Sequence, residues 1–315
     1  APGQPGKLNI VNADELFGFG VEGVDVGLSM FKAQLPDFFK AKDFFSFYAH
    51  ADAVRTYGMG DVLKIQATDV TIELNSGGEL FGGLMRSTAD FSESSKADPA
   101  TGRPAGFEVK TGGTPVYLDM KGTNLMGVDI GHAEIQVSEF LYLSGSLAFR
   151  KGDRVNVDVN LGGLQTLFDQ TAGVGSRLNL EVEMLTLGGA NLTGFAGVGG
   201  PYRYGADANG DGLGDLINEG AIGLVIDDVD FGMAIATPGL LAIPQLASVA
   251  PKFLAVKAHV GTAGLVGVDE SVMAVEAHNI DVNINTFYLP SGGALNAALQ
   301  LFGPPSIDYQ ASFAS

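Results

Sequence analysis

The acidic stretch DANGDGLGD, from Asp207 to Asp215, has the residue types and spacing of a cation-binding loop. Oxygen-bearing side chains stand at alternate positions and curl towards one point, and a glycine at the sixth position permits the sharp turn. The expected ligands are Asp207, Asn209, Asp211, the backbone carbonyl of Leu213, Asp215 and Glu219. The sequence therefore predicts a Ca²⁺ site, with an acidic surface turn that binds no metal as the alternative.

The end of this loop departs from the EF-hand pattern. The twelfth position, where an EF-hand has a bidentate Glu, is Asn218, and Glu219 follows it. The spacing more nearly resembles loops of the dockerin or thrombospondin type. The final ligand, Asn218 or Glu219, stays open. Since no amphipathic helix of ordinary length flanks the loop, a helical calcium sensor is not expected.

Other chemistry has weak support in the sequence. The chain has no Cys, which excludes disulfides and thiol catalysis, and it has no G-x-S-x-G sequence. The glycines of Gly18–Gly23 match G-x-G-x-x-G, but a strand-like run follows them instead of a helix, so we expect them to lie in a strand. We expect no catalytic residue and no organic cofactor, and the protein is predicted not to be an enzyme.

Two of the four histidines, His50 and His259, occupy matching places in similar sequence segments. A matched pair could mark a repeated metal site. Neither has a second His or a carboxylate at an evident ligand spacing in the sequence. We therefore expect both on half-exposed strand faces.

The charge of the chain excludes some partners. The 315 residues carry a net charge of −18, which repels nucleic acids and anionic membrane surfaces. The segment 204–250 contains seven acidic residues and no Lys or Arg. The uncharged and mostly apolar stretch 231–251 contains three prolines, so no transmembrane segment is expected.

Apolar and polar residues alternate in several runs, which is typical of strands with one buried and one wet face. The clearest runs are Val70–Leu74, Val155–Leu161, Leu178–Met184 and Ile280–Ile284, and glycine pairs separate such runs. The sequence therefore predicts an all-β fold: an elongated sandwich, prism or solenoid-like body of long amphipathic strands. A few short helices are expected at 35–45, 164–170, 240–249 and 294–302.

Segments near the two ends of the chain resemble each other in the same order. The offset is 205 residues at Asp25 and Asp230, 209 at His50 and His259, and 210 at Asp69 and Asn279. Residues 89–92 (ADFS) likewise match 307–310 (IDYQ). We predict a first β-repeat unit at 1–206, a calcium-binding junction at 207–219 and a partial second copy at 220–315. A chain that stops inside a repeat is expected to be part of a longer array.

The run FLAVKAHVGTAGLVGVDESVMAVEAHNIDVNIN (253–285), preceded by VDFGMAI (229–235) and DANGDG (207–212), resembles the long repeats of very large secreted bacterial proteins. Those repeat proteins are adhesin-like or matrix-like and often carry calcium motifs. The resemblance implies an extracellular or cell-surface structural role and no catalytic residues.

Together these observations predict a calcium-stabilised repeat segment of a fibre- or layer-forming surface protein. Self-association with identical copies is expected, through exposed sheet edges or the Phe-rich region at 38–48. The main alternative is a calcium-dependent module that binds carbohydrate or another surface ligand. An extracellular hydrolase and a carrier of apolar ligands are less favoured.

Overall fold

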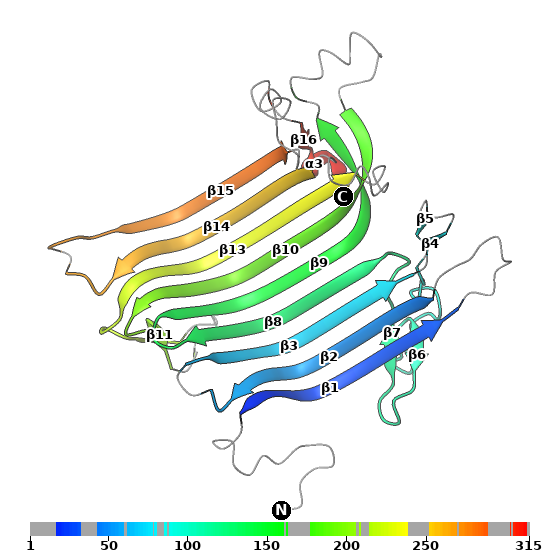
Figure 1. Ribbon diagram of the computed structural model, residues 1–315, viewed down its shortest axis with the longest axis horizontal. Coiled ribbons are helices and arrows are strands. Elements are labelled where there is room, and N and C mark those ends of the chain that lie inside the picture. The colour runs from blue at the N-terminus through cyan, green and yellow to red at the C-terminus, as the bar shows by residue number, and fades with distance from the viewer. Residues whose placement is uncertain are drawn as a thin grey trace, which may run out of the picture.

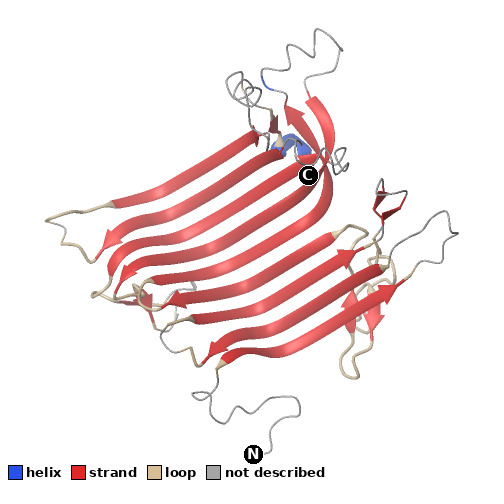
Figure 2. Ribbon diagram, in the orientation of Figure 1, coloured by secondary structure: helices blue, strands red, loops and turns tan. Residues whose placement is uncertain are grey.

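The computed structural model confirms the all-β prediction: the described residues form long strands and one short helix (Figures 1 and 2). The structure describes residues 17–32, 43–59, 62–77, 79–80, 85–86, 88–160, 162, 177–205, 208, 214–238, 252–269, 271–288, 303 and 305–313. The four predicted helical segments fall on residues outside these ranges, apart from 43–45, where Phe44 and Phe45 begin a strand.

Nine long strands build one open antiparallel sheet, in the order β1-β2-β3-β8-β9-β10-β13-β14-β15 (Figure 1). These strands are β1 (Gly18–Phe31), β2 (Phe44–Tyr57), β3 (Lys64–Ser76), β8 (Leu125–Val137), β9 (Leu141–Asn160), β10 (Arg177–Val198), β13 (Ile222–Pro238), β14 (Lys252–Val266) and β15 (Glu276–Tyr288). Each strand pairs with its neighbours, so β1 and β15 are the edges of this sheet among the described residues.

Short elements extend or accompany the sheet. β16 (Ser306–Ile307) pairs with the far end of β9, and the helix α3 (Tyr309–Ser312) follows it. In the described part of the chain, three pairs of very short strands form hydrogen bonds with each other and not with the large sheet. They are formed by β4 (Glu79–Leu80) with β5 (Met85–Arg86), β6 (Phe107–Val109) with β7 (Val116–Leu118), and β11 (Arg203–Tyr204) with β12 (Leu216–Ile217).

The four runs chosen for their alternation lie in strands, in β3, β9, β10 and β15, apart from Leu161, which is outside the described residues. The G-x-G-x-x-G run also lies in a strand, β1, as the sequence predicted. Its last glycine, Gly23, has a φ of 60°, a conformation that glycine adopts without the Cβ clash of other residues. These glycines therefore lie within a strand and not in the turn between a strand and a helix that a dinucleotide-binding motif requires.

A row of backbone irregularities crosses the sheet. Among the described residues, five strands have a left-handed residue there: Gly23 in β1, Asp69 in β3, Asn191 in β10, Asp228 in β13 and Asn279 in β15, with φ between 51° and 60°. The residues beside them on neighbouring strands are skipped in the pairing, as Asp52 is between Ala51 and Ala53. Asp and Asn tolerate this conformation better than other non-glycine residues, which explains their presence in the row.

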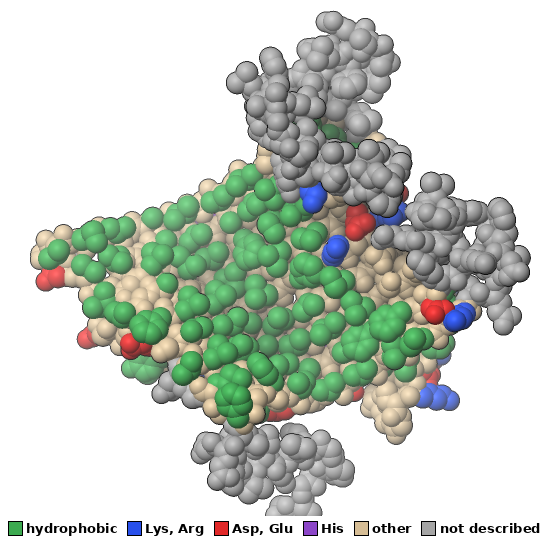
Figure 3. Space-filling view, viewed as in Figure 1, with side chains coloured by type: hydrophobic (Ala, Val, Ile, Leu, Met, Phe, Trp, Pro, Cys, Tyr) green, Lys and Arg blue, Asp and Glu red, His purple; other side chains and the backbone are tan. Residues whose placement is uncertain are grey.

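The row shifts the phase of the alternation by one residue. In β1 the apolar side chains are at odd positions before it, Phe19 and Val21, and at even positions after it, Val24 and Val26. A left-handed residue within a strand interrupts the regular alternation and bends the strand. Over most of the sheet the apolar side chains consequently stay on one face, which Figure 3 shows as a nearly continuous layer. At the ends of β9 and β10, beyond a further register shift between Met184 and Leu185, apolar side chains such as Val157 and Val182 belong instead to a core on the opposite face.

Short segments cover parts of the opposite face and form three small cores among the described residues. One contains Phe91, Leu118 and Met120 over β2, and a Cβ at Gly27 of β1 would lie 2.7 Å from Val116 of β7. A second lies under β16 and α3 and includes Val157, Phe253 and Ile307, and a third contains Phe195, Ala221 and Val225. In the described part of the chain, compact packing is therefore found on the face that carries the polar residues.

The strands β13–β15 reproduce the pairing register of β1–β3. Asp25 pairs with His50 and Ala51 with Val70 in the first set, and the residues at the same offsets, Asp230 with His259 and Val260 with Ile280, pair in the second. The left-handed residues correspond as well, Gly23 to Asp228 and Asp69 to Asn279. Both sets belong to one continuous sheet, while the proposed boundaries at 206 and 220 stay a prediction.

Candidate functional site

The predicted calcium loop lies only partly within the described residues. Asp207, Asn209, Asp211 and Leu213 are outside them, whereas Asp215 and Glu219 are described and exposed. The Asp215 Oδ2 accepts a hydrogen bond of 2.8 Å from the backbone N–H of Ala208. The ladder between β11 and β12 brings the two ends of the loop together, with Arg203 opposite Ile217 and Tyr204 opposite Leu216.

The side chain of Asn218 has a structural use at the base of this loop. Its Nδ2 donates to the backbone oxygens of Gly199 at 2.6 Å and Pro201 at 3.2 Å, and its Oδ1 accepts from the backbone N–H of Gly220. Both ends of the amide thus tie neighbouring backbone segments together. This favours Glu219 over Asn218 as the final ligand of the predicted site.

Histidines and carboxylates gather along the row of irregularities on the polar face. His50 Nδ1 lies 3.2 Å from the Thr71 hydroxyl and 3.7 Å from Asp69, and His50 Nε2 lies 3.6 Å from Asp52. In the second set, His259 Nδ1 lies 3.0 Å from Asp281. His278, on the same row, lies 3.3 Å from Glu276.

The expectation that His50 and His259 have no carboxylate at ligand spacing is wrong, because both lie within 4 Å of an Asp side chain. The half-exposed position expected for His50 is correct. Asp69 and Asp281 belong to the next strand of the sheet, so their proximity depends on the hairpin register and not on spacing along one strand. These contacts could have been found by pairing the alternating runs of consecutive strands as antiparallel hairpins, which places each histidine beside the carboxylate of the next strand. Among the described residues, no three such side chains form a group able to hold a metal ion.

An arginine joins two carboxylates on the same face. The Arg150 guanidinium lies 2.7 Å from Asp129 and 3.3 Å from Glu73, which are on β8 and β3. Burial raises the pKa of Glu73 above its ordinary value, and the adjacent Arg150 opposes this rise. Burial, followed by the charge of Glu73, also raises the pKa of Tyr48 on the neighbouring β2.

A shallow depression of about 440 Å³ lies over the middle of the sheet. Small residues such as Gly131, Gly188 and Ala190 line it, with Asp69 and Asp129 at its side. The Ser146 hydroxyl within it donates to the backbone oxygen of Gly131 at 2.6 Å, so the hydroxyl is used in a backbone contact. This arrangement offers no activated nucleophile among the described residues of the depression.

The described pair that most resembles a nucleophile and its base is Ser144 with His132. The Ser144 Oγ lies 3.3 Å from the His132 Nε2. Ser144 is only 2% exposed, however, and a nucleophile must be accessible to its substrate. We therefore regard this contact as structural.

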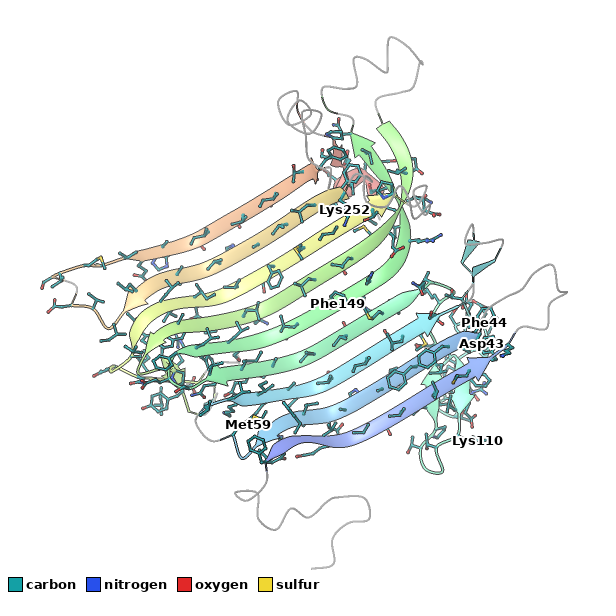
Figure 4. The ribbon with its side chains drawn as sticks, in the orientation of Figure 1. Asp43, Phe44, Met59, Lys110, Phe149 and Lys252 are labelled. Carbon is teal, nitrogen blue, oxygen red and sulfur yellow. The ribbon has the colours of Figure 1, made fainter. Side chains whose placement is uncertain are left out.

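The apolar face is the largest feature of the molecule without a covering segment among the described residues. Phe149 lies near its centre, and acidic and basic side chains are found near its margins (Figures 3 and 4). Leu28 on β1 is 48% exposed and Ile284 on β15 is 43% exposed, so the face is open at both edges of the sheet. Sequence alternation predicted the apolar side of each strand but not which of these sides are covered, as at Val157 and Val182, and which lie on the open surface, as at Ile72 and Val282.

The size of this face is unusual for an isolated protein. Nine strands about 4.8 Å apart, with about 13 residues rising about 3.3 Å each, cover on the order of 1,800 Å². The largest apolar patch on a typical monomer is about 300–600 Å². A surface of this extent is suited to packing against another layer.

The comparisons with known proteins add no relative. No protein-family model matches the chain, and no match is found among curated proteins or among solved structures. No helix among the described residues combines the length and hydropathy that crossing a bilayer requires. The resemblance to secreted bacterial repeat proteins therefore stays a prediction.

Proposed function

We propose that the chain is a structural module of an extracellular or cell-surface assembly, in which the apolar face of the sheet packs against the same face of a second copy. The observation that carries the proposal is the nearly continuous apolar layer to which all nine long strands contribute. Calcium bound at Asp207–Glu219 is part of the proposal, since the acidic stretch beside β13 needs a counter-charge.

Sheet-on-sheet packing fits the shape and chemistry of this face. Two twisted sheets pack with their layers about 10 Å apart when both inner faces are apolar. A stable complex buries about 800 Å² on each partner, less than half of the apolar face. The histidine and carboxylate row lies on the opposite face, so two acidic surfaces would point outward and keep the pair soluble.

A carrier of apolar ligands is the second candidate, because the same face could cover lipid chains. The described residues give this candidate no enclosed cavity, and ligand carriers bury most of the ligand surface in a cleft. A glycan-binding module could use the shallow depression beside Asp69 and Asp129, or a smaller pocket of about 240 Å³ beside Arg154 and Glu183. The second-copy proposal uses the whole apolar face, which is why we prefer it.

Sedimentation of the full chain tests the proposal, with adjacent residues on β9 as a matched pair. Phe149 points to the apolar face, whereas Ala148 pairs with Asp129 on the other face. Phe149→Lys should weaken association by about 100-fold or more, as expected for a charge at an interface centre, while Ala148→Lys should change it little. Leu28→Lys, at an exposed edge position, provides a second apolar-face variant that does not threaten folding.

The outcomes separate the candidate functions. A wild-type chain that stays monomeric at high concentration contradicts the second-copy proposal. Extraction of a fluorescent phospholipid from phosphatidylcholine vesicles by that monomer would instead support the carrier. Calcium-dependent retention on a glycan array, unaffected by Phe149→Lys, would support the ligand-binding module.

A further inference from the structure

The two edge strands of the sheet each have a counterpart that is paired on both sides. β15 matches β3 in register, and the outer side of β3 pairs with β8. β1 matches β13, and the outer side of β13 pairs with β10. The fold therefore contains a model for each edge: β8 shows how a strand pairs with the counterpart of β15, and β10 shows how a strand pairs with the counterpart of β1.

We infer that the outer edge of β15 is a docking site for a further strand with the pattern of β8, supplied by another unit of the same repeat. The inference rests on the proposed structural role but concerns a different surface, the edge of the sheet and not its apolar face. By the same correspondence, β1 would accept a strand with the pattern of β10. Such pairing would extend the sheet with the period β1-β2-β3-β8-β9-β10.

The pairing between β3 and β8 defines the required pattern. Val70, Ile72 and Leu74 of β3 lie opposite apolar residues of β8. The corresponding residues of β15 are Ile280, Val282 and Ile284. A β8-like strand would continue the apolar face across the new junction.

The row of irregularities adds a more specific requirement. Gly131 of β8 stands beside the left-handed Asp69, and a Cβ at position 131 would lie 2.8 Å from the Asp69 Cβ. Asn279 has the same left-handed backbone on β15. The docking strand therefore needs a glycine beside Asn279.

One position differs between β3 and β15, and this difference predicts which residue the docking strand should carry opposite it. Asp129 of β8 lies opposite Thr71, whose counterpart on β15 is Asp281. Two carboxylates directly opposite each other destabilise a strand pair. A neutral or basic residue at this position of the docking strand should therefore bind better than Asp.

The residues of β15 itself include few of the usual devices that prevent edge pairing. Natural edge strands are protected by Lys, Pro, short length or bulges. β15 has 13 residues and contains no Lys, Arg or Pro. Its irregular residue, Asn279, is no obstacle, because β3 has Asp69 at the same place and pairs with β8.

The absence of cysteine from the chain allows a register-specific test. Gly127 of β8 pairs with Glu73, whose counterpart on β15 is Asn283. A peptide of residues 125–137 with Gly127→Cys would be mixed under mild oxidation with the full chain carrying Asn283→Cys and Phe149→Lys. A second peptide would carry Val128→Cys, which places the thiol on the other face of the same register.

The expected result is a disulfide with the first peptide, formed at least about 10-fold faster than with the second, because a disulfide requires close Cβ atoms. Adding Asp129→Lys to the first peptide should increase the rate further. The inference would be overturned by equal rates for both cysteine positions, or by no disulfide with the first peptide whether or not it carries Asp129→Lys. Face-to-face association of the wild-type chain, measured separately by sedimentation, would show that the proposed function stands even then.

Discussion

The strand sets β1–β3 and β13–β15 have one register and different surroundings. Both keep an Asp beside a His, Asp25 with His50 and Asp230 with His259, although most other side chains differ. In the first set, β3 pairs with β8 on its outer side, whereas in the second set β15 is an edge strand of the sheet. The comparison teaches that a common backbone pattern fixes the register, and that the covering segments decide how much each set is stabilised.

Corresponding asparagines show this difference at single-residue scale. Asn75 is fully buried, accepts from Ser46 at 2.9 Å and donates to the backbone oxygens of Ala89 and Lys121. Asn285 is exposed and donates to the backbone oxygen of Ile307. The matched contacts to Ala89 and Ile307 agree with the alignment of 89–92 with 307–310.

The largest expected difference in stability is between variants that remove the side-chain amide of Asn75 or of Asn285. Asn75→Ala should lower the free energy of unfolding by about 3 kcal/mol, because buried hydrogen-bonding groups lose their partners. Asn285→Ala should cost only about 0.5–1 kcal/mol, since water can replace the lost donor. Urea unfolding of both variants measures the difference. Equal costs would show that burial of the first set contributes less than we argue.

Removal of calcium should destabilise the strands β13–β15 more than the strands β1–β3. The acidic loop directly precedes β13 in the sequence. If the loop binds Ca²⁺, saturation at 100 times the dissociation constant stabilises the folded state by about 2.7 kcal/mol. Excess chelator should then increase amide hydrogen exchange in β13–β15 more than in β1–β3. Asp211→Asn should weaken the response, and exchange that is unchanged by chelator in both sets would contradict the site.

The left-handed positions predict effects of opposite sign. Gly23→Ala should destabilise by about 1–2 kcal/mol, because a non-glycine residue is strained at this φ and its Cβ would overlap the Asp52 side chain. Asp228→Gly should stabilise slightly, by up to about 1 kcal/mol, because glycine relieves the same strain. Thermal melts of the two variants provide the measurement. Destabilisation by both would mean that the Asp228 side chain has a structural use that outweighs the strain.

The smallest effect concerns Glu73, whose counterpart on β15 is the uncharged Asn283. Because the folded-state pKa of Glu73 is raised, its stabilising contribution is present below the ordinary pKa and is lost as pH rises through the folded-state value. Relative to Glu73→Gln, the wild type should therefore lose stability from about pH 4.5 upward, by less than about 1 kcal/mol after allowance for partial exposure. Melting temperatures of both proteins across this range test the sign. A difference that moves in the opposite direction would show that Arg150 dominates.

Much of the fold could be predicted from the sequence, because alternation directly reports the two faces of a strand. The runs at Val70–Leu74 and Ile280–Ile284 also contain the repeat on which the register comparison depends. The phase shifts could not be recognised in the same way. A single left-handed residue such as Asp69 leaves no mark beyond one break in the pattern, and any loop would produce the same break.

The candidate sites were less predictable for a physical reason. The contact between His259 and Asp281 joins neighbouring strands, so it follows from register and not from spacing along the chain. The open apolar face depends on how strands are layered, which alternation alone does not determine. The calcium loop could be proposed from the sequence because its expected ligands come from one continuous segment, and it stays a prediction.

The row of left-handed residues has a mechanical consequence. It runs across the strands, in the direction in which pairing at β1 and β15 would lengthen the sheet, and the long strands curve together in Figure 1. A thin plate with a fold along its long axis behaves like an angled beam, which resists bending far better than a flat plate of the same thickness. A filament built from this sheet would therefore gain stiffness from the fold line without any additional layer of protein.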